Sequence, residues 1–350
     1  MIKMLRSAIL AGSVLIFAAA ACGAVPGARK IIIDTDPGAD DALAILLALN
    51  SPELDVQALT VVAGNVVVEQ GLTNALKLVS LAGRCDVRVA RGAGHPLVQK
   101  LTTAEFFHGK NGLGDVELPV PACHADTRFA PDLIIELVHQ YPHEITLVPV
   151  GPLTDIALAV EKDPSLVPLV KEVLVMGGSL SGGNATAAAE ANIYNDPEAA
   201  RVVFEAGWPL TMVGLNVTEK TLITRVDLER LAETHGPQND FVVGVLRFMV
   251  DLARKLGAEG TAMHDPLTVG AVIDRTLITT RDMRVDIETR GEYTRGETVA
   301  SRHNSADRRI LRGDRYVIEG IEKVQPNVHV AVESDARRFI ALFLSRIAGK

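Results

Sequence analysis

The sequence predicts an α/β fold, with an open, mainly parallel twisted sheet and helices on both of its faces. Short apolar segments rich in β-branched residues, typical of buried strands, alternate with segments of helical periodicity along most of the chain. Strands that alternate with helices in this way pair in parallel, because each helix returns the chain to the same edge of the sheet. A chain of 350 residues, 48% of them hydrophobic, also supplies enough apolar side chains for a large core.

The first strand and the first helix enclose an acidic turn. Residues 31–33 are three consecutive isoleucines, as expected for a buried parallel strand, and residues 42–49 predict a buried helix. Between them, residues 34–41 contain four carboxylates. A helix N-cap explains one or two of these, but not the two nearest the strand. Because carboxylates this close repel one another unless a cation or protons intervene, the turn predicts a Ca²⁺ or Mg²⁺ site at the carboxyl end of the strand.

Further strands and helices follow in order as far as residue 215. The predicted strands are residues 56–63, 87–90, 145–150, 172–176 and 210–215. The predicted helices are residues 68–81, 132–140, 153–160 and 197–206. The last helix has Asp196 as its N-cap and Pro197 at its first position. Residues 91–131 predict a long loop, and loops of that length inside a compact domain tend to be functional.

The C-terminal part of the chain is more helical. A long amphipathic helix is predicted at residues 241–256, and a second helix opens at His264-Asp265-Pro266 and runs through Ile273. The remaining predicted segments are a strand within 276–289, a charged insertion or hairpin at 301–323, a strand at 328–332 and a helix at 335–347.

The N-terminus has the pattern of an export signal. Lys3 and Arg6 precede an apolar run at residues 8–21 that ends in small residues and Cys22. This predicts an exported protein, periplasmic or anchored to the membrane as a bacterial lipoprotein through Cys22; a retained N-terminal anchor is the alternative. We therefore divide the chain into a leader (1–22), a linker (23–29) and a single domain (30–350).

Charge and cysteine content set further bounds. The formal net charge of −8 and the 4% aromatic content argue against a nucleic-acid partner, which needs basic faces and stacking platforms. The spacing of Cys85 and Cys123 fits no metal motif, and the sequence leaves open whether they pair.

Seven motifs resemble, in order, those of the inosine–uridine-preferring nucleoside hydrolase family. The first is the acidic turn itself, Ile33-Asp34-Thr35-Asp36-Pro37-Gly38-Ala39-Asp40-Asp41-Ala42. The others lie at residues 64–66, 107–114, 150–154, 175–178, 190–199 and 263–266. The resemblance covers nearly everything from Lys30 onward and implies an open α/β fold with a Rossmann-like core. It also implies hydrolysis of the N-glycosidic bond of ribonucleosides to ribose and free base, a bound Ca²⁺, and a homodimer or homotetramer.

The resemblance assigns roles to individual residues. It implies that Asp36, Asp41, Asp265 and the backbone carbonyl of Val150 bind the metal. Asp36 also matches the general base that takes a proton from the metal-bound water, and His264 matches the residue proposed to help the base leave. Asp34 matches a position that supports the ligands. The matching substrate positions are Asp40, Asn65, Met176, Asn184, Glu190 and Asn192 around the ribose, and His108 near the base.

These residue types suit the reaction. Breaking an N-glycosidic bond develops positive charge on the ribose ring, and nearby carboxylates stabilise that charge. A cation orients water, a carboxylate removes its proton, and a histidine can protonate the departing base. Each assignment has a structural alternative. Asp265 can cap a helix, Asn184 can be a turn residue, Glu190 a surface carboxylate, Met176 plain core and His108 a loop histidine.

Substrate preference and two other functions remain open. Purine-specific relatives stack the base on tryptophans, whereas Trp208 lies in a predicted helix-to-strand turn. We therefore expect a broad or pyrimidine-tolerant enzyme. Asp34-Thr35-Asp36 also resembles the Asp-x-Asp of haloacid-dehalogenase-like phosphatases, but Pro37-Gly38 fits that motif poorly. An exported nucleoside-binding protein without catalysis is the second alternative.

Overall fold

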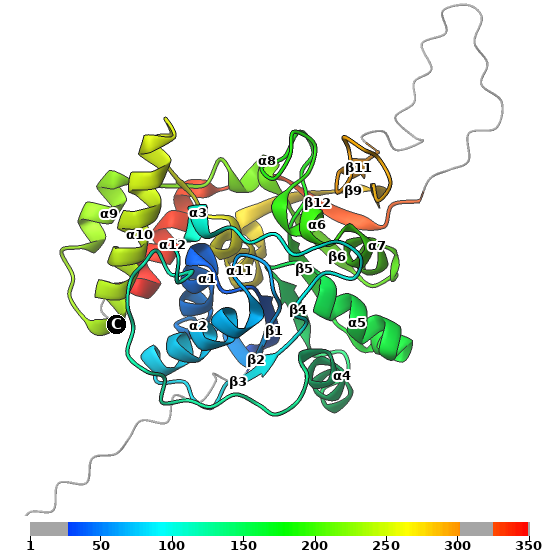
Figure 1. Cartoon of the computed structure of the whole chain (residues 1–350), viewed down its shortest axis with the longest axis horizontal. Coiled ribbons are helices and arrows are strands. Elements are labelled where there is room, and N and C mark those ends of the chain that lie inside the picture. The colour runs from blue at the N-terminus through cyan, green and yellow to red at the C-terminus, as the bar shows by residue number, and fades with distance from the viewer. Residues whose placement is uncertain (1–26, 302–324, 349–350) are drawn as a thin grey trace, which may run out of the picture.

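A central sheet organises the computed structural model, which describes residues 27–301 and 325–348 (Figure 1). Its strands follow the order β3 (Arg88–Arg91), β2 (Leu54–Val61), β1 (Arg29–Thr35), β4 (Thr146–Pro149), β5 (Glu172–Met176), β6 (Leu210–Val213), β12 (Val328–Ser334) and β9 (Ile278–Met283). The pairs from β3 to β12 are parallel, and β9 at one edge is antiparallel to β12. This confirms the predicted open, mainly parallel sheet.

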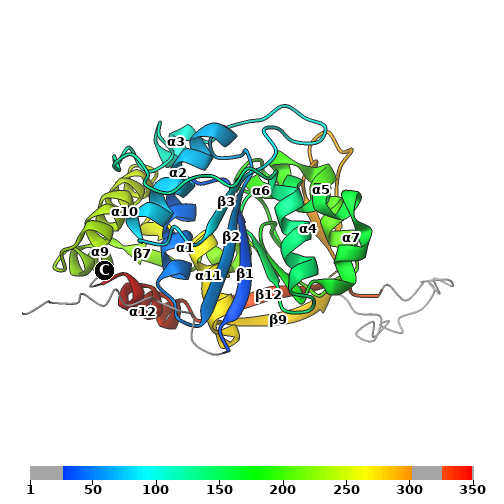
Figure 2. The same cartoon turned by 90° about the horizontal axis from the view of Figure 1, so that it is seen from below.

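Helices cover both faces of the sheet, which Figure 2 shows nearly edge-on. One face carries α1 (Ala39–Leu49), α2 (Val68–Leu81), α10 (Pro237–Lys255), α11 (His264–Ile273) and α12 (Ala336–Ile347). The other face carries α4 (Ala130–Gln140), α5 (Thr154–Lys162) and α7 (Pro197–Glu205). Ile31 and Ile33 belong to the first core and Ile32 to the second. The three isoleucines therefore alternate between two hydrophobic layers, which explains why this strand is apolar throughout.

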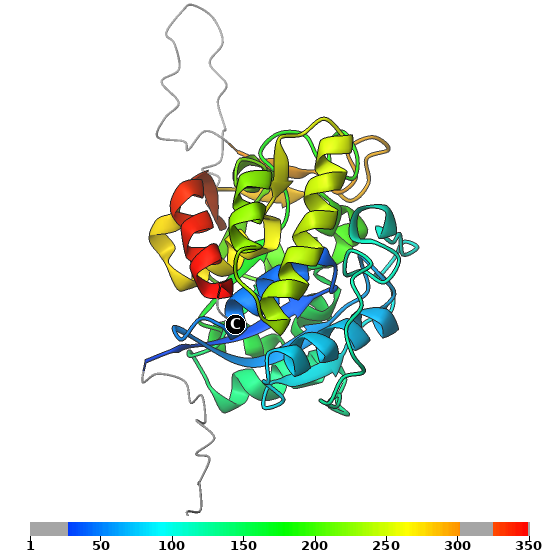
Figure 3. The same ribbon diagram turned by 90° about the vertical axis from the view of Figure 1, so that its left-hand side faces the viewer.

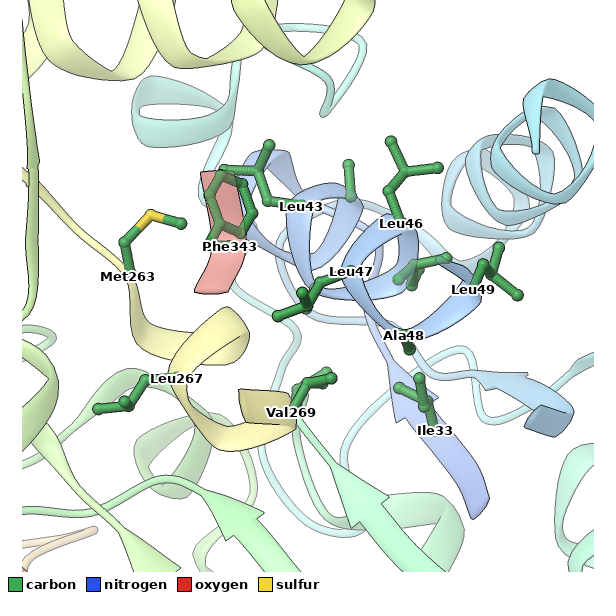
Figure 4. Packing of buried hydrophobic residues seen from close by; sticks show 14 of the residues in the cluster. Ile33, Leu43, Leu46, Leu47, Ala48, Leu49, Met263, Leu267, Val269 and Phe343 are labelled. Atoms are coloured by element: carbon green, nitrogen blue, oxygen red, sulfur yellow. The ribbon is translucent and has the colours of Figure 1, made fainter. Parts of the chain in front are cut away.

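Helix α1 is buried along its whole length. It begins at Ala39, inside the acidic turn, and so starts earlier than the sequence predicted. Figure 4 shows Leu47 between α1 and α11, and Leu43 close to Phe343 of α12. Because both surfaces of α1 are packed, its first turn is held in a fixed position above the end of β1.

The C-terminal half forms a further helical layer beside α1. Figure 3 shows α12 in red next to the yellow-green segment of α9 (Arg225–Leu231) and α10. Helix α10 begins at Pro237, four residues before its predicted start, and ends at Lys255. Helix α11 begins at His264 and ends at Ile273, as predicted.

Several short elements were not predicted. They are the helices α3 (Glu105–His108), α6 (Ala191–Asn195), α8 (Leu215–Thr218), η1 (Pro164–Leu169) and η2 (Arg275–Leu277), the antiparallel pair β7 (Leu222–Thr224) and β8 (Gly260–Ala262), and the strand β11 (Thr298–Ala300), which pairs antiparallel with β10 (Val285–Ile287). Each of these elements has six residues or fewer, so none shows a clear hydrophobic period in the sequence. The predicted strand within residues 276–289 is divided between β9 and β10.

Cys85 and Cys123 form a disulfide, which settles the question that the sequence left open. The bond joins the turn after α2 to the long loop before α4. The predicted leader with Cys22 and nearly all of the segment 301–323 lie outside the described residues. Among the helices of the described ranges, none combines the length and apolar character required to cross a bilayer.

Candidate active site

The site lies where the strand order changes direction. From β1 the chain adds β2 and β3 on one side, and then returns to place β4 on the other. The backbone N–H of Val150, just after β4, donates to the carbonyl of Asp34 at 2.8 Å. The carboxyl ends of β1 and β4 therefore lie together, which is the usual position of a ligand crevice in an open α/β sheet.

Three buried carboxylates from two helices converge at this edge. Asp40 and Asp41 stand in the first turn of α1, and Asp265 stands in the first turn of α11. One oxygen atom from each lies within 4.8 Å of the other two, so the three can hold a metal ion. Residues 224 positions apart in the chain meet here because α1 packs directly against α11.

Asp41 is fixed by hydrogen bonds to both of its oxygens. Oδ1 accepts from the Thr35 hydroxyl at 2.5 Å, and Oδ2 accepts from Gly38 N–H at 2.9 Å and from Asn65 Nδ2 at 3.0 Å. The N-cap of α1 is Gly38 rather than an aspartate, but Asp41 contributes to the capping from the third helical position, because it accepts the Gly38 N–H. The same contacts hold one carboxylate of the cluster in a single orientation.

Other carboxylate oxygens at the site lack partners. Asp36 Oδ2 accepts from Asn65 N–H at 2.6 Å, but Asp36 Oδ1, Asp40 Oδ1 and Asp265 Oδ2 are buried without a hydrogen-bond partner among the described residues. Burial and the neighbouring negative charges raise the pKa of Asp36 and Asp265 well above the ordinary range. Buried carboxylate oxygens without a hydrogen-bond partner are strongly unfavourable unless a cation or protons compensate their charge. The all-oxygen donor set therefore fits a hard divalent cation.

Two glycines allow the backbone to approach Asp36. A Cβ added at Gly64 would lie 2.0 Å from Asp36 Oδ2, and one at Gly151 would lie 2.6 Å from Asp36 Oδ1. Any larger residue at either position must displace the carboxylate. The glycines of two of the sequence motifs thus serve to bring three chain segments around one side chain.

A second group of polar residues surrounds the start of α6. Glu190 is buried and caps this helix, because its carboxylate accepts from the N–H groups of Asn192 and Ile193 and, across the turn, of Gly178. Asn192 Nδ2 donates to the carbonyl of Val150 at 2.8 Å and to that of Met176 at 3.2 Å. The Val150 carbonyl, which was predicted to bind the metal, therefore accepts a hydrogen bond from Asn192, which was predicted to bind the ribose.

Asn184 and Met176 complete this side of the site. Asn184 Oδ1 accepts from the N–H of Ala191, so its side chain ties the glycine-rich turn to α6. Met176 is buried at the end of β5, and its sulfur lies 3.4 Å from Asn192 Nδ2. Each of these two predicted ribose-binding residues thus has a structural contact, Asn184 with α6 and Met176 with Asn192.

Two histidines approach the cluster from different elements. His108, at the end of α3, accepts a hydrogen bond at Nδ1 from Ala39 N–H at 3.1 Å, and this nitrogen lies 3.5 Å from Asp40 Oδ1. His264 Nδ1 lies 2.7 Å from the hydroxyl of Thr218. Burial lowers the pKa of His264, whereas the charges of Asp40 and Glu219 oppose that shift. The carboxylates are thus flanked by two imidazoles.

Some structural alternatives can now be decided. Asp265 does not cap α11, because the residue at that position is Met263 and Asp265 Oδ2 has no partner in the described part of the chain. Glu190 is not a surface carboxylate. Trp208 is buried between α7 and β6, donates to the Val203 carbonyl, and so stands before a strand rather than at the site edge.

The sequence reading missed Asp155, which lies beneath the site. Its side chain is fully buried in the first turn of α5, and Oδ1 accepts from Ala93 N–H at 2.8 Å. Burial raises the pKa of Asp155 to about 7. Burial, and after it the nearby charge of Asp155, raises the pKa of Asp34. Asp34 is in turn held by the hydroxyl of Thr60 at 2.6 Å. Asp155 follows β4 as the acidic turn follows β1. The rule that ligands bind at the carboxyl ends of parallel strands could therefore have identified it from the sequence.

Comparison with known proteins agrees with this geometry. Residues 31–341 match the family model described as inosine-uridine preferring nucleoside hydrolase. A curated relative from Citrobacter koseri, described as pyrimidine-specific ribonucleoside hydrolase RihA, is 39% identical over 323 residues, which cover 92% of this chain and 98% of the relative.

Two solved structures are similar over the same range. A plant nucleoside hydrolase, PpNRh1, superposes with a TM-score of 0.83 at 37% identity and covers 92% of this chain and 99% of its own. A purine-preferring ribonucleoside hydrolase from Gardnerella vaginalis gives a TM-score of 0.82 at 34% identity, with 92% and 98% covered. All three are named as nucleoside or ribonucleoside hydrolases.

Proposed function

Because this chain belongs to the inosine-uridine preferring nucleoside hydrolase family and is a hydrolase of ribonucleoside N-glycosyl bonds, we propose that it works with a calcium ion and with Asp36 as the general base. The observation that carries this proposal is the group of three buried carboxylates, Asp40, Asp41 and Asp265, whose oxygens lie within 4.8 Å of one another.

The cation would be held by Asp36, Asp41, Asp265 and the carbonyl of Val150, with Asp40 at its edge. All of these donors are oxygen atoms, as Ca²⁺ prefers, and irregular sets of carboxylates and carbonyls suit Ca²⁺ better than the strict octahedron of Mg²⁺. When bound, the ion orients water and sugar hydroxyls and eases loss of a proton from that water. It also reverses the electrostatic cost of burying several carboxylates together.

The side chains carry out the proton transfers. Asp36 accepts a proton from the attacking water through Oδ1, the oxygen that has no partner within the described residues. Its other oxygen remains on Asn65 N–H, which keeps the carboxylate oriented. His264 gives a proton to the departing base. The negative charges of Asp40 and Glu190 favour the positive charge that develops on the ribose.

Recognition of the ribose is assigned to the polar groups around this centre. They are Asp40, Asn65, Met176, Asn184, Glu190 and Asn192. His108 stands next to the base, and the exposed rings of Phe106 and Phe107 precede it on α3. Trp208 is excluded from this pocket by its burial elsewhere, so we propose a broad or pyrimidine-tolerant specificity. One relative named above is pyrimidine-specific and another is purine-preferring, which leaves the choice of base to experiment.

We also propose that the protein is exported. The leader pattern at residues 1–22 supports this, as does the disulfide between Cys85 and Cys123, because disulfides persist in oxidising compartments. Cys22 is the proposed lipid attachment site, and the proposed assembly is a homodimer or homotetramer.

The test is release of free ribose by the purified protein. Uridine, cytidine, inosine and guanosine are each incubated with wild-type protein in calcium, in magnesium and in a chelator. Asp36→Asn should lower kcat by about 10²–10⁴-fold, the range typical of a lost general base. Asp240→Asn removes an exposed carboxylate in the first turn of another helix and should change nothing. Full activity of the chelated protein, or of Asp36→Asn, would contradict the proposal.

A further inference from the structure

The imidazole of His264 is held through one nitrogen. Nδ1 lies 2.7 Å from Thr218 Oγ1, and within the part of the chain that the structure describes no other hydrogen bond to the ring is found. The two residues are 46 positions apart, and Thr218 belongs to none of the seven sequence motifs. The contact therefore has no explanation in the roles assigned above.

Thr218 is placed rigidly. Its side chain is fully buried at the end of α8, its N–H donates to Gly214, and its carbonyl accepts from Thr221 N–H at 3.0 Å. The start of α8 is fixed as well, because Leu215 N–H donates to the carbonyl of Gly178, and Asn216 Nδ2 donates to the carbonyl of Ala331 at 2.8 Å. The hydroxyl of Thr218 is thus a fixed point beside the site.

The backbone next to His264 is held by the same turn, residues 218–222. Met263 N–H, directly before His264, donates to the carbonyl of Thr221 at 2.9 Å. The β7–β8 ladder pairs Leu222 with Ala262 and continues this contact. Backbone and ring of His264 are therefore both positioned by residues 218–222, so that the ring cannot turn without losing the bond to Thr218.

We propose that Thr218 is a positioning residue for the reaction, which holds Nδ1 of His264 so that Nε2 is the nitrogen that faces the departing base. This inference rests on the proposed role of His264 as proton donor. The threonine hydroxyl accepts from Nδ1–H of the imidazolium, and Nε2–H is left as the donor. A fixed donor is effective because proton transfer requires hydrogen-bond distance and alignment in the transition state.

The proton balance is complete in this arrangement. As the bond between C1′ and the base nitrogen breaks, its electron pair moves to the base, which takes the proton from Nε2. Water supplies its oxygen to C1′ and one proton to Asp36, which then releases that proton to solvent, while His264 takes up one proton from solvent before the next turnover. The neutral ring keeps Nδ1–H on Thr218 throughout, so the ring does not have to reorient.

The experiment compares two substrates that differ in their need for a proton. Uridine requires protonation of a poor leaving group, whereas p-nitrophenyl β-D-ribofuranoside releases a stable phenolate. Thr218→Val should lower kcat on uridine by about 10- to 100-fold, part of the usual contribution of a general acid, and change KM by less than about threefold. On the nitrophenyl substrate, kcat should change by less than about threefold. Thr218→Ser should restore most of the activity on uridine.

A matched control and a double mutant separate positioning from packing. Thr221 is also fully buried, and its hydroxyl bonds the Val217 carbonyl and Ser334 rather than the histidine. Thr221→Val keeps the backbone carbonyl that holds Met263 and should therefore affect kcat on the two substrates by the same factor. In a His264→Ala background, Thr218→Val should have no further effect on uridine. Equal losses on the two substrates, or additive losses in the double mutant, would overturn the inference. If the wild-type protein releases ribose from neither substrate, the proposed function itself fails.

Discussion

Asp265 should make the protein less stable when no cation is bound. Its Oδ2 atom is buried with no partner among the described residues, and the charges of Asp40, Asp41 and Asp36 all act against its ionised form. A buried polar group left unsatisfied costs about 1–3 kcal/mol. Asp265→Asn keeps the size of the side chain and removes its charge. We therefore expect the ion-free variant to be more stable than the ion-free wild type by about 1–3 kcal/mol.

Calcium should reverse this order. A ligand at 100 times its Kd stabilises the folded state by about 2.7 kcal/mol. For a chain of this size, each kcal/mol raises the Tm by roughly 1–2 °C, so calcium should raise the Tm of the wild type by roughly 3–5 °C. The variant lacks one charged ligand and should gain much less. The same substitution thus stabilises the empty site and weakens the occupied one.

Thermal unfolding in calcium and in chelator measures both effects. Asp240→Asn again serves as the exposed control and should unfold like the wild type in both conditions. The reasoning is refuted if the wild-type Tm does not depend on calcium. It is also refuted if Asp265→Asn destabilises the ion-free protein, because the carboxylate would then have a partner that the structure does not contain.

Three further predictions concern other parts of the fold. Burial raises the pKa of Asp155 to about 7, so the folded protein binds this proton more tightly than the unfolded chain, and wild-type stability falls as pH rises from about 4 to 7. In denaturant titrations, the free energy of unfolding of Asp155→Asn relative to that of the wild type should increase over that window and then stay constant. A difference between the two proteins that is the same at pH 4 and pH 8 would contradict this. Cys85→Ser with Cys123→Ser should lower the free energy of unfolding by about 2–4 kcal/mol, and a reductant should destabilise only the wild type. Gly64→Ala should lower kcat by at least about tenfold by displacing the proposed base, whereas Gly94→Ala, whose Cβ meets only ordinary contacts, should not.

The fold was predictable where one segment carries its own signal. The isoleucine run at β1 and the carboxylates after it identify a buried strand and a site at its end, without knowledge of any other element. The packing partner of each helix was not predictable in this way. Asp265 lies near Asp40 only because α11 packs against α1. The local sequence of either helix does not indicate which helix surfaces pack against each other.

The less visible parts of the site depend on contacts distant in sequence. Glu190 caps a five-residue helix, which is too short to show a helical period. Thr218, just before β7, contacts His264, just after β8, and Asp155 acts on Asp34 from the first turn of α5. For such residues the sequence shows a side chain of suitable chemistry, but only the tertiary structure shows the group that it faces.

The position of the carboxylates at two helix N-termini has an electrostatic consequence. Asp40 and Asp41 stand in the first turn of α1, and Asp265 in the first turn of α11, where the helix dipole and free N–H groups favour negative charge. A helix N-terminus stabilises a nearby carboxylate by about 0.3–1 kcal/mol, which is too little to offset the cost of burying several carboxylates together. A cation supplies the remainder, and its affinity must depend on the distance between the two helix ends. That distance is set by apolar contacts such as Leu47 between α1 and α11 (Figure 4). The hydrophobic core would therefore influence metal affinity, because it holds the two acidic turns against each other.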